Sequence, residues 1–123
     1  EVKVETKIHH GDLKLHCDPD QITMILINLV KNASESLQNQ ADRTIWLSSI
    51  GQGDLGLMIQ VEDSGPGIIP EELERIFVPF YSTKKTGSGI GLAISRQIMN
   101  LHKGSLEVTS IPNERTVFTM TFR

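Results

Sequence analysis

The sequence has little cysteine and few aromatic residues: its 123 residues include one cysteine, one tryptophan and one tyrosine. A single cysteine, Cys17, excludes an intrachain disulfide framework. No apolar run approaches the ~18 residues of a membrane span, and no signal peptide opens the chain. Positive charge is not in excess either, because the net charge is −3. Without a basic field we expect no nucleic-acid partner, and an anionic ligand would need local geometry, a metal ion or a few lysines.

The composition, 38% hydrophobic and 22% charged, predicts one globular domain over residues 1–123. Because the chain begins in the middle of a pattern, we expect a fragment of a longer protein. Alternating apolar residues predict strands at 2–8, 43–50, 55–63, 104–110 and 116–123, with a further short strand at 11–17. Helices are expected at 19–37, 69–77 and 92–101. This order predicts a two-layer α/β sandwich, with a mixed sheet of about five strands against about three helices.

The first expected helix carries the first candidate site. Asp18 suits the N-cap, Pro19 the first turn, and Gln21 completes a capping-box pattern. Asn28 and Asn32 lie four residues apart within an otherwise apolar helix, on a face that Glu35 shares. Asparagine is a poor helix former, and unpaired burial costs about 1–3 kcal/mol. The helix alone leaves two interpretations equally open: bonds to backbone or water, or amide oxygens that meet a hard cation such as Mg²⁺.

Two glycine-containing stretches carry the remaining candidates. In "EDSGPGI", Asp63 ends a predicted strand, where its carboxylate could accept from an exocyclic amine while glycines let a flat ring approach. In "KKTGSGIGLAI", three alternating glycines precede a helix, whose first N–H groups attract anions. The spacing fits neither a dinucleotide-binding fingerprint nor a Gly-Lys-Ser/Thr phosphate loop. Either stretch alone is also typical of an ordinary turn.

The order of four motifs is more specific than any one of them. "NLVKNASES", "EDSGPGI", "RIFVPFYSTK" and "GSGIGLAI" follow one another with compatible spacing. Together they resemble the boxes of the ATP-binding domain of sensor histidine kinases, within the gyrase–Hsp90–kinase–MutL superfamily. The resemblance covers residues 18–122 and implies the Bergerat ATP-binding fold, with ATP and Mg²⁺ as ligands.

Carried over by position, the resemblance implies a role for each matching residue. Asn32 matches the Mg²⁺ ligand, with Asn28 one turn earlier facing the phosphates, and both are candidate catalytic residues. Asp63 matches the adenine-binding aspartate, and Phe77 lies in the aromatic box at the base of a mobile lid, expected at 82–88. The implied ATP-binding set is Asn28, Asn32, Asp63, Gly65, Gly67, Ile68, Phe80, Thr83, Lys84, Lys85, Gly87, Ser88, Gly89, Ile90, Gly91 and Leu92.

One departure points to a subfamily and two alternatives stay open. Glu35 and Ser36 stand where many members have a lysine followed by an aromatic residue, which resembles nitrogen-regulator-type kinases. The gyrase–Hsp90–MutL hydrolases place a glutamate one turn before the metal asparagine, where this chain has Asn28, which cannot act as a base. That hydrolase function and a non-catalytic nucleotide-sensing module are the alternatives.

The resemblance also implies partners and a location. None of the four histidines lies in a phosphoacceptor motif, so the acceptor is expected on a separate dimerisation domain of the same protein. The family further implies a downstream response regulator, a homodimeric full-length protein and a monomeric isolated domain. The domain itself would be cytoplasmic, within a protein that the inner membrane can anchor.

Overall fold

The computed structural model describes residues 2–9, 17–51, 56–81 and 90–123. Of the short strand expected at 11–17, all but Cys17 therefore lies outside the described residues. The five strands are β1 (Lys3–His9), β2 (Thr44–Gly51), β3 (Leu57–Asp63), β4 (Ser105–Ile111) and β5 (Arg115–Phe122). The three helices are α1 (Pro19–Ser36), α2 (Pro70–Leu73) and α3 (Gly91–Leu101). These bounds confirm the predicted number and order of the other elements.

The strands form a single mixed sheet in the order β1-β2-β3-β5-β4. β1 runs parallel to β2, so α1 is the crossover that connects them. All other neighbouring pairs are antiparallel, and β5 lies between β3 and β4. The register places Asp63 of β3 opposite both Ile45 of β2 and Thr116 of β5. The end of β3 is therefore flanked by a strand on each side.

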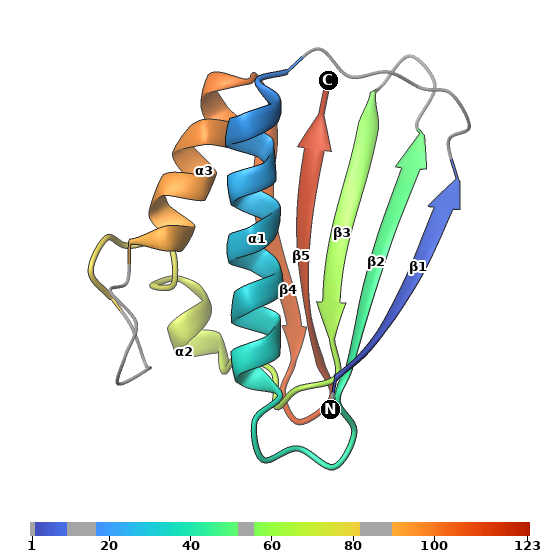
Figure 1. Cartoon of the computed structure of the whole chain (residues 1–123). Coiled ribbons are helices and arrows are strands. Elements are labelled where there is room, and N and C mark those ends of the chain that lie inside the picture. The colour runs from blue at the N-terminus through green and yellow to red at the C-terminus, as the bar shows by residue number, and fades with distance from the viewer. Residues whose placement is uncertain (1, 10–16, 52–55, 82–89) are drawn as a thin grey trace.

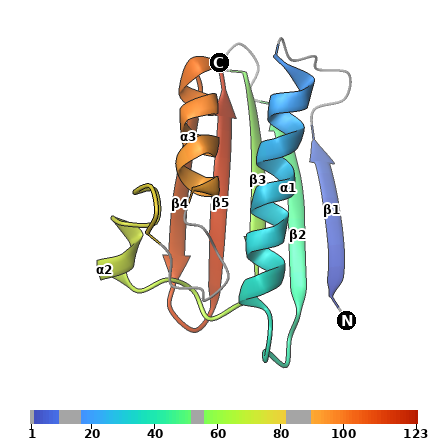
Figure 2. The same ribbon diagram turned by 60° about the vertical axis from the view of Figure 1, so that its left-hand side comes forward.

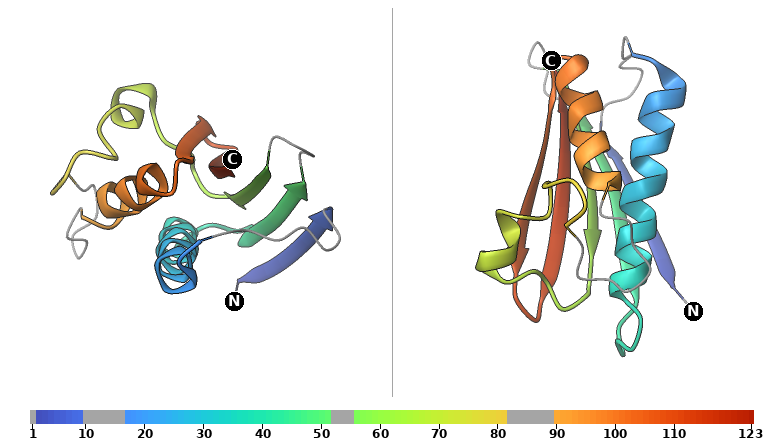
Figure 3. Two further views of the ribbon diagram at one scale, coloured as in Figure 1. Left: turned by 90° about the horizontal axis from the view of Figure 1, so that it is seen from above. Right: turned by 90° about the vertical axis from the view of Figure 1, so that its left-hand side faces the viewer.

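Figures 1 and 3 show α1 and α3 side by side over one face of the sheet, running in opposite directions, with α2 beyond α3. Figure 2 shows α1 in front of β2 and β3, and α3 in front of β4 and β5. Contacts along the chain agree, because α1 packs on β2 and β3 while α3 packs on β4. The structure thus has two layers, as expected from the sequence.

The core lies between these two layers. Apolar residues at three- and four-residue spacing in α1 are buried against alternate residues of the sheet. Ile25 and Leu29 of α1 and Met120 of β5 are fully buried. The remaining core residues are Ile22, Ala33, Leu37, Ile45, Leu57, Val61, Ile98, Met99, Leu106, Phe118 and Phe122.

The start of α1 is capped from two directions. The Asp18 carboxylate accepts hydrogen bonds from the N–H groups of Asp20 and Gln21, at 3.0 and 3.3 Å, as the cap pattern predicts. The backbone N–H of Asp18 donates to Nε2 of His102, at the end of α3. The other ring nitrogen of His102 lies 2.9 Å from the carbonyl oxygen of Ile98. In a capping box, the Gln21 side chain would accept from the Asp18 N–H. Here His102 is that acceptor, and its hydrogen bond connects the end of α3 to the start of α1.

The expected helix at 69–77 is shorter in the structure. α2 ends at Leu73, and hydrogen-bonded turns continue to Tyr81. In the turns that follow, the Phe77 ring packs edge-on against Phe118, with Arg96 over its face at 4.1 Å. α3 begins at Gly91, one residue before the predicted start.

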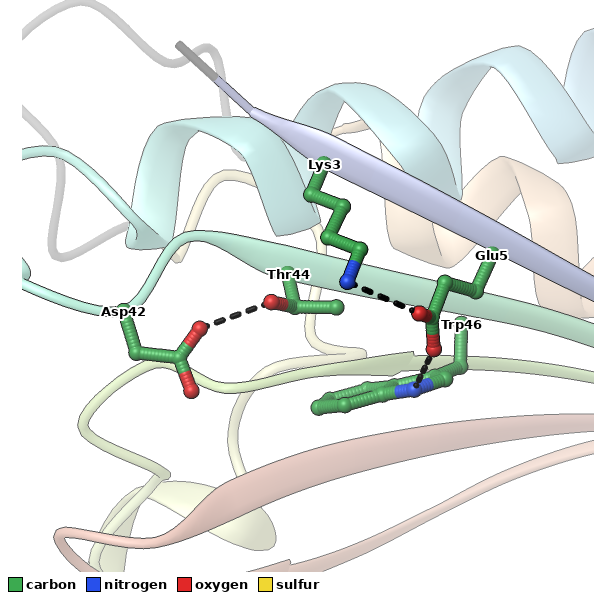
Figure 4. Close-up of polar contacts among 5 residues, drawn as sticks. All are labelled: Lys3, Glu5, Asp42, Thr44 and Trp46. Atoms are coloured by element: carbon green, nitrogen blue, oxygen red, sulfur yellow. Dashed lines mark hydrogen bonds and ion pairs between the residues drawn. The ribbon is translucent and has the colours of Figure 1, made fainter.

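The far edge of the sheet is held by polar contacts, which Figure 4 shows. The half-buried Trp46 of β2 donates from its indole nitrogen to the Glu5 carboxylate at 2.8 Å, and Lys3 pairs with the same carboxylate at 3.0 Å. Bonding to Lys3 and to Trp46 lowers the pKa of Glu5 below its ordinary value. Nearby, the Thr44 hydroxyl donates to Asp42 at 2.7 Å. Of these contacts, the bond from Trp46 to Glu5 joins β2 to β1.

Candidate functional site

Asp63 ends β3 on the face of the sheet that carries the helices. Its exposed fraction is 4%, and its Oδ1 accepts a hydrogen bond from the N–H of Gly65 at 2.8 Å. The register places Thr116 of β5 beside it, and Thr116 is also a buried polar residue. Buried polar side chains need hydrogen-bond partners, and Thr116 has one in the Ser110 hydroxyl, 3.5 Å away, as Asp63 has in Gly65. This row of the sheet thus places two fixed polar groups at the end of an otherwise apolar face.

Sequence reasoning missed Thr116. Its signal is the alternation in β5, which places Thr116, Phe118, Met120 and Phe122 on one face, so that a single hydroxyl interrupts an apolar row.

The segment after Asp63 is a tight turn that depends on two glycines. A Cβ atom on Gly65 would lie 2.7 Å from the Asp63 carboxylate and 3.0 Å from the Ser36 hydroxyl at the end of α1. Gly67 has a φ of +75°, and a Cβ atom there would lie 2.6 Å from the carbonyl oxygen of Ile111. Both glycines are therefore required by close approach within the protein, in addition to any approach of a ligand.

Ser110 of β4 fixes the next residue of this turn. Its hydroxyl oxygen accepts from the N–H of Ile68 at 2.6 Å and donates to the carbonyl of Arg115 at 3.1 Å. The N–H of Asn113 bonds to the carbonyl of Pro66 across the same gap. Ile68 was predicted as a site residue, whereas Ser110 was not, because its partner lies 42 residues away.

Three polar residues that the sequence singles out in α1 share one flank of the helix, and Asn28 on that flank contacts α3. Asn28, Asn32 and Glu35 are all half-buried, and their spacing places them along one side of the helix. The Asn28 side chain donates from Nδ2 to the hydroxyl oxygen of Ser95 in α3, at 3.3 Å. Asn28 thus makes a contact between helices, whereas its predicted contact with phosphates stays a prediction.

Gly91 is the first residue of α3 and meets the same asparagine. A Cβ atom on Gly91 would lie 2.9 Å from Cγ and Nδ2 of Asn28, and closer still to Oδ1. The next residue, Leu92, is half-buried against the core, and Ile90 precedes the helix as a residue without a side-chain capping bond. Packing of α3 against α1 is therefore one reason for a glycine at position 91. The predicted contact of backbone N–H groups with phosphates is a second.

The other predicted residues are more scattered. Phe80 has a φ of +69° and its side chain is 76% exposed, so it contributes little to the core. Thr83, Lys84, Lys85, Gly87, Ser88 and Gly89, and with them the expected lid, lie outside the described residues.

The described candidates lie along one side of α1, from its middle to its C-terminal end. Ser36, at the C-terminal end, meets the turn after Asp63, and Asn28 meets the start of α3. Eight residues of helix separate these two points by about 12 Å, with Asn32 between them. A carboxylate at one end and amides beside a helix N-terminus at the other suit an elongated ligand with a hydrogen-bonding base and an anionic tail.

The donor set fits a magnesium ion held mainly by its ligand. Within the described ranges, no group of three or more His, Cys, Asp or Glu side chains could hold a metal ion. Mg²⁺ commonly takes one or two protein oxygens and completes its shell with phosphate and water. The amide oxygens of Asn28 and Asn32 can supply such ligands without a dedicated cage.

Among the residues that the structure describes, no helix combines the length and the apolar character that a bilayer crossing requires.

Comparisons with known proteins identify relatives over most of the chain. Residues 17–123 match the family described as histidine kinase-, DNA gyrase B-, and HSP90-like ATPase. The sensor histidine kinase ZraS of Salmonella typhi is 39% identical over 107 residues, which are 87% of this chain and 23% of that protein. The sensory histidine kinase/phosphatase NtrB of Escherichia coli O157:H7 is 37% identical over 103 residues, 77% of this chain and 30% of that protein. The chain thus spans under a third of these two relatives.

A solved structure of similar shape is the catalytic domain of histidine kinase ThkA, in a nucleotide-free form. It superimposes with a TM-score of 0.85 at 32% identity, covering 98% of this chain and 78% of that one. The two-layer fold of this chain is therefore similar to that of a histidine kinase catalytic domain.

Proposed function

We propose, since this chain belongs to the family of histidine kinase-, DNA gyrase B- and HSP90-like ATPases, that it is the ATP-binding catalytic domain of a two-component sensor histidine kinase. It would present Mg-ATP for transfer of the γ-phosphoryl group to a histidine on a separate dimerisation domain. The observation that carries this proposal is Asp63, a buried carboxylate fixed by the Gly65 N–H at the end of a central strand. Such an acceptor, fixed before a ligand arrives, suits the exocyclic amine of adenine and excludes the carbonyl oxygen that guanine presents.

The positions of the described residues support a proposed role for each. Asp63, Gly65, Gly67 and Ile68 form the base end, and Asn28 and Asn32 form the phosphate end with the start of α3. Asn32 would hold Mg²⁺ through its amide oxygen, and the ion would supply charge neutralisation of the phosphate oxygens. Phe80, Thr83, Lys84, Lys85 and residues 87–92 complete the proposed ATP-binding set.

The proposed reaction needs a partner. Phosphoryl transfer depends mostly on positioning and charge stabilisation, and amides of Asn28 and Asn32 cannot deprotonate an attacking water. We therefore propose that a histidine-bearing dimerisation domain of the same protein is the acceptor, in a homodimer that then phosphorylates a response regulator. The isolated domain would be a monomer without self-phosphorylation. A domain that uses ATP in this way belongs in the cytoplasm, within a protein that the inner membrane can anchor.

The first test is Asp63→Asn. Asparagine can keep an oxygen for the Gly65 N–H, but it loses the carboxylate opposite the adenine amine, costing about 1–3 kcal/mol of binding. Calorimetry should show ATP affinity lowered about 5- to 150-fold, with the melting temperature of the ligand-free chain unchanged. Glu62→Gln is the matched control, because Glu62 precedes Asp63 and points to the other face of the strand. Unaltered ATP affinity in Asp63→Asn would remove Asp63 from the site.

The second test concerns catalysis. The chain mixed with radiolabelled ATP should stay unlabelled and release little phosphate. Addition of a histidine-bearing helical domain from the same protein should produce an acid-labile phosphohistidine on that partner. Brisk ATP hydrolysis by the chain alone, abolished by Glu35→Gln, would replace the kinase proposal by the hydrolase alternative.

A further inference from the structure

Ser95 is a polar residue in a position where the fold otherwise places apolar side chains. It lies one turn after the start of α3, its exposed fraction is 3%, and its neighbours toward the core are Ile98 and Met99. It belongs to none of the predicted site residues. A buried hydroxyl in a helix is retained at low cost only when it has a hydrogen-bond partner.

The partner of Ser95 is the amide of Asn28, 67 residues earlier in the chain. Nδ2 of Asn28 donates to the Ser95 hydroxyl oxygen at 3.3 Å. The other side of the same amide rests against the bare Cα of Gly91, where an added Cβ atom would overlap with Oδ1. The amide is thus held between two residues of α3, one by a hydrogen bond and one by the absence of a side chain.

We infer that Ser95 is a positioning residue for Asn28, an inference that rests on the proposed ATP-binding function. With Nδ2 bound to Ser95, the group that Asn28 keeps toward the start of α3 is its oxygen. An oxygen at that place suits Mg²⁺ or a water bound to it, whereas a turned amide would present a donor. Ser95 therefore selects which end of the Asn28 amide meets the proposed phosphate site, and Gly91 leaves the space for it.

The same contact joins α1 to the first turns of α3. The stretch that enters α3 is the glycine-rich motif predicted to contact the phosphates, and Gly91 is its last glycine. A bond from Asn28 to the first turns of α3 holds that end of the helix against the helix that carries Asn32. Loss of Ser95 should thus reduce the effect of Mg²⁺ on ATP binding, which a serine that served only packing would leave unchanged.

The test measures ATP affinity by calorimetry in Mg²⁺ and in EDTA, on the 123-residue chain. Ser95→Ala should weaken ATP binding in Mg²⁺ about 3- to 10-fold and change it less than about 2-fold in EDTA. Ser34→Ala is the matched control, since Ser34 is a half-buried serine of α1 on the flank away from Asn28. In an Asn28→Ala background, Ser95→Ala should have no further effect on affinity. Equal losses in Mg²⁺ and EDTA, or independent effects of the two changes, would overturn the inference.

A nucleotide-free measurement tests the contact separately from the proposed function. Gly91→Ala should lower the melting temperature in the otherwise unmodified chain and lower it much less when Asn28 is also changed to alanine. If the two substitutions add, Asn28 does not occupy the space beside Gly91, and the positioning role fails. If they couple but the unmodified chain does not bind ATP, the proposed function fails, and with it the role of Ser95 toward Mg²⁺.

Discussion

The two ends of the candidate site are built in different ways. At the base end, strands and a turn hold Asp63 and Ile68 through bonds of 2.8 and 2.6 Å that involve backbone N–H groups. At the phosphate end, a side-chain bond of 3.3 Å and the close approach of Gly91 to Asn28 join two helices. The base end is therefore fixed by the backbone, whereas the phosphate end depends on how α3 lies against α1.

This difference suits the two parts of a nucleotide. A base is recognised by shape and by a few fixed acceptors, so a preformed wall loses little entropy on binding. A phosphate tail changes length and charge during transfer. The contact between α1 and α3, called here the helix seam, can adjust to this change with small movements. We expect substitutions at the base end to affect ATP and ADP alike, and those at the helix seam to affect the two nucleotides differently.

The largest effect is expected from Gly67→Ala, which should break the base end. Alanine at a φ of +75° would be strained, and its Cβ atom would lie 2.6 Å from a carbonyl oxygen. Together these should lower the free energy of unfolding by about 2 kcal/mol or more. Urea unfolding measures this loss, and calorimetry should show similar fractional losses of ATP and ADP affinity. An unchanged unfolding midpoint would show that the turn relaxes freely.

Asn32→Ala tests the phosphate end, where we expect an effect that depends on Mg²⁺ and on the nucleotide. Loss of one oxygen ligand should weaken ATP binding about tenfold in Mg²⁺, on the scale of losing a group that tunes metal affinity, and have little effect in EDTA. Asn100→Ala, an exposed asparagine of α3, is the matched control. If EDTA weakens binding equally in Asn32→Ala and in the unmodified chain, the metal is held elsewhere. The substitution should affect ADP binding less than ATP binding. ADP offers fewer phosphate oxygens to Mg²⁺, so the ion contributes less to its binding.

The smallest effect is expected from His102→Phe, at the far end of the helix seam. Phenylalanine keeps a ring but removes the acceptor for the Asp18 N–H and the partner of the Ile98 carbonyl. A loss of about 0.5–1.5 kcal/mol in unfolding free energy is expected from urea titration. ATP affinity should change less than about 2-fold, because the contact lies at the opposite end of α3 from Gly91. A large loss of affinity would show that the whole seam acts as one unit.

The elements that the sequence predicted well are those specified locally. α1 follows from its apolar period, from Asp18 as cap and from Pro19, and its bounds differ from the prediction by one residue at the C-terminal end. Asp63 at the end of β3 follows from the strand pattern and the glycines after it. Such features depend on residues within a few positions of each other, which a single sequence displays.

The features that it missed depend on contacts between distant residues. Ser95, Ser110 and His102 bond to residues 67, 42 and 84 positions away. The apolar residues at helical spacing, Leu92, Ile98 and Met99, place Ser95 on the buried face of α3, but nothing within a turn of it identifies Asn28 as its partner. His102 has no metal or catalytic spacing. The packing of Phe77 on Phe118, just after α2, is likewise a contact that the local sequence does not specify.

The position of β5 in the sheet has a consequence for how the chain is made. β5 is the last strand in this sequence, yet it pairs with both β3 and β4 and supplies Phe118, Met120 and Phe122 to the core. During synthesis, β1, β2 and β3 emerge from the ribosome first, but β3 has no second neighbour until residues 115–122 follow. The nascent chain must therefore keep this edge of β3 exposed until then. The pairing of β3 with β5, in which Leu57 lies opposite Phe122, has a high contact order and is slow to form.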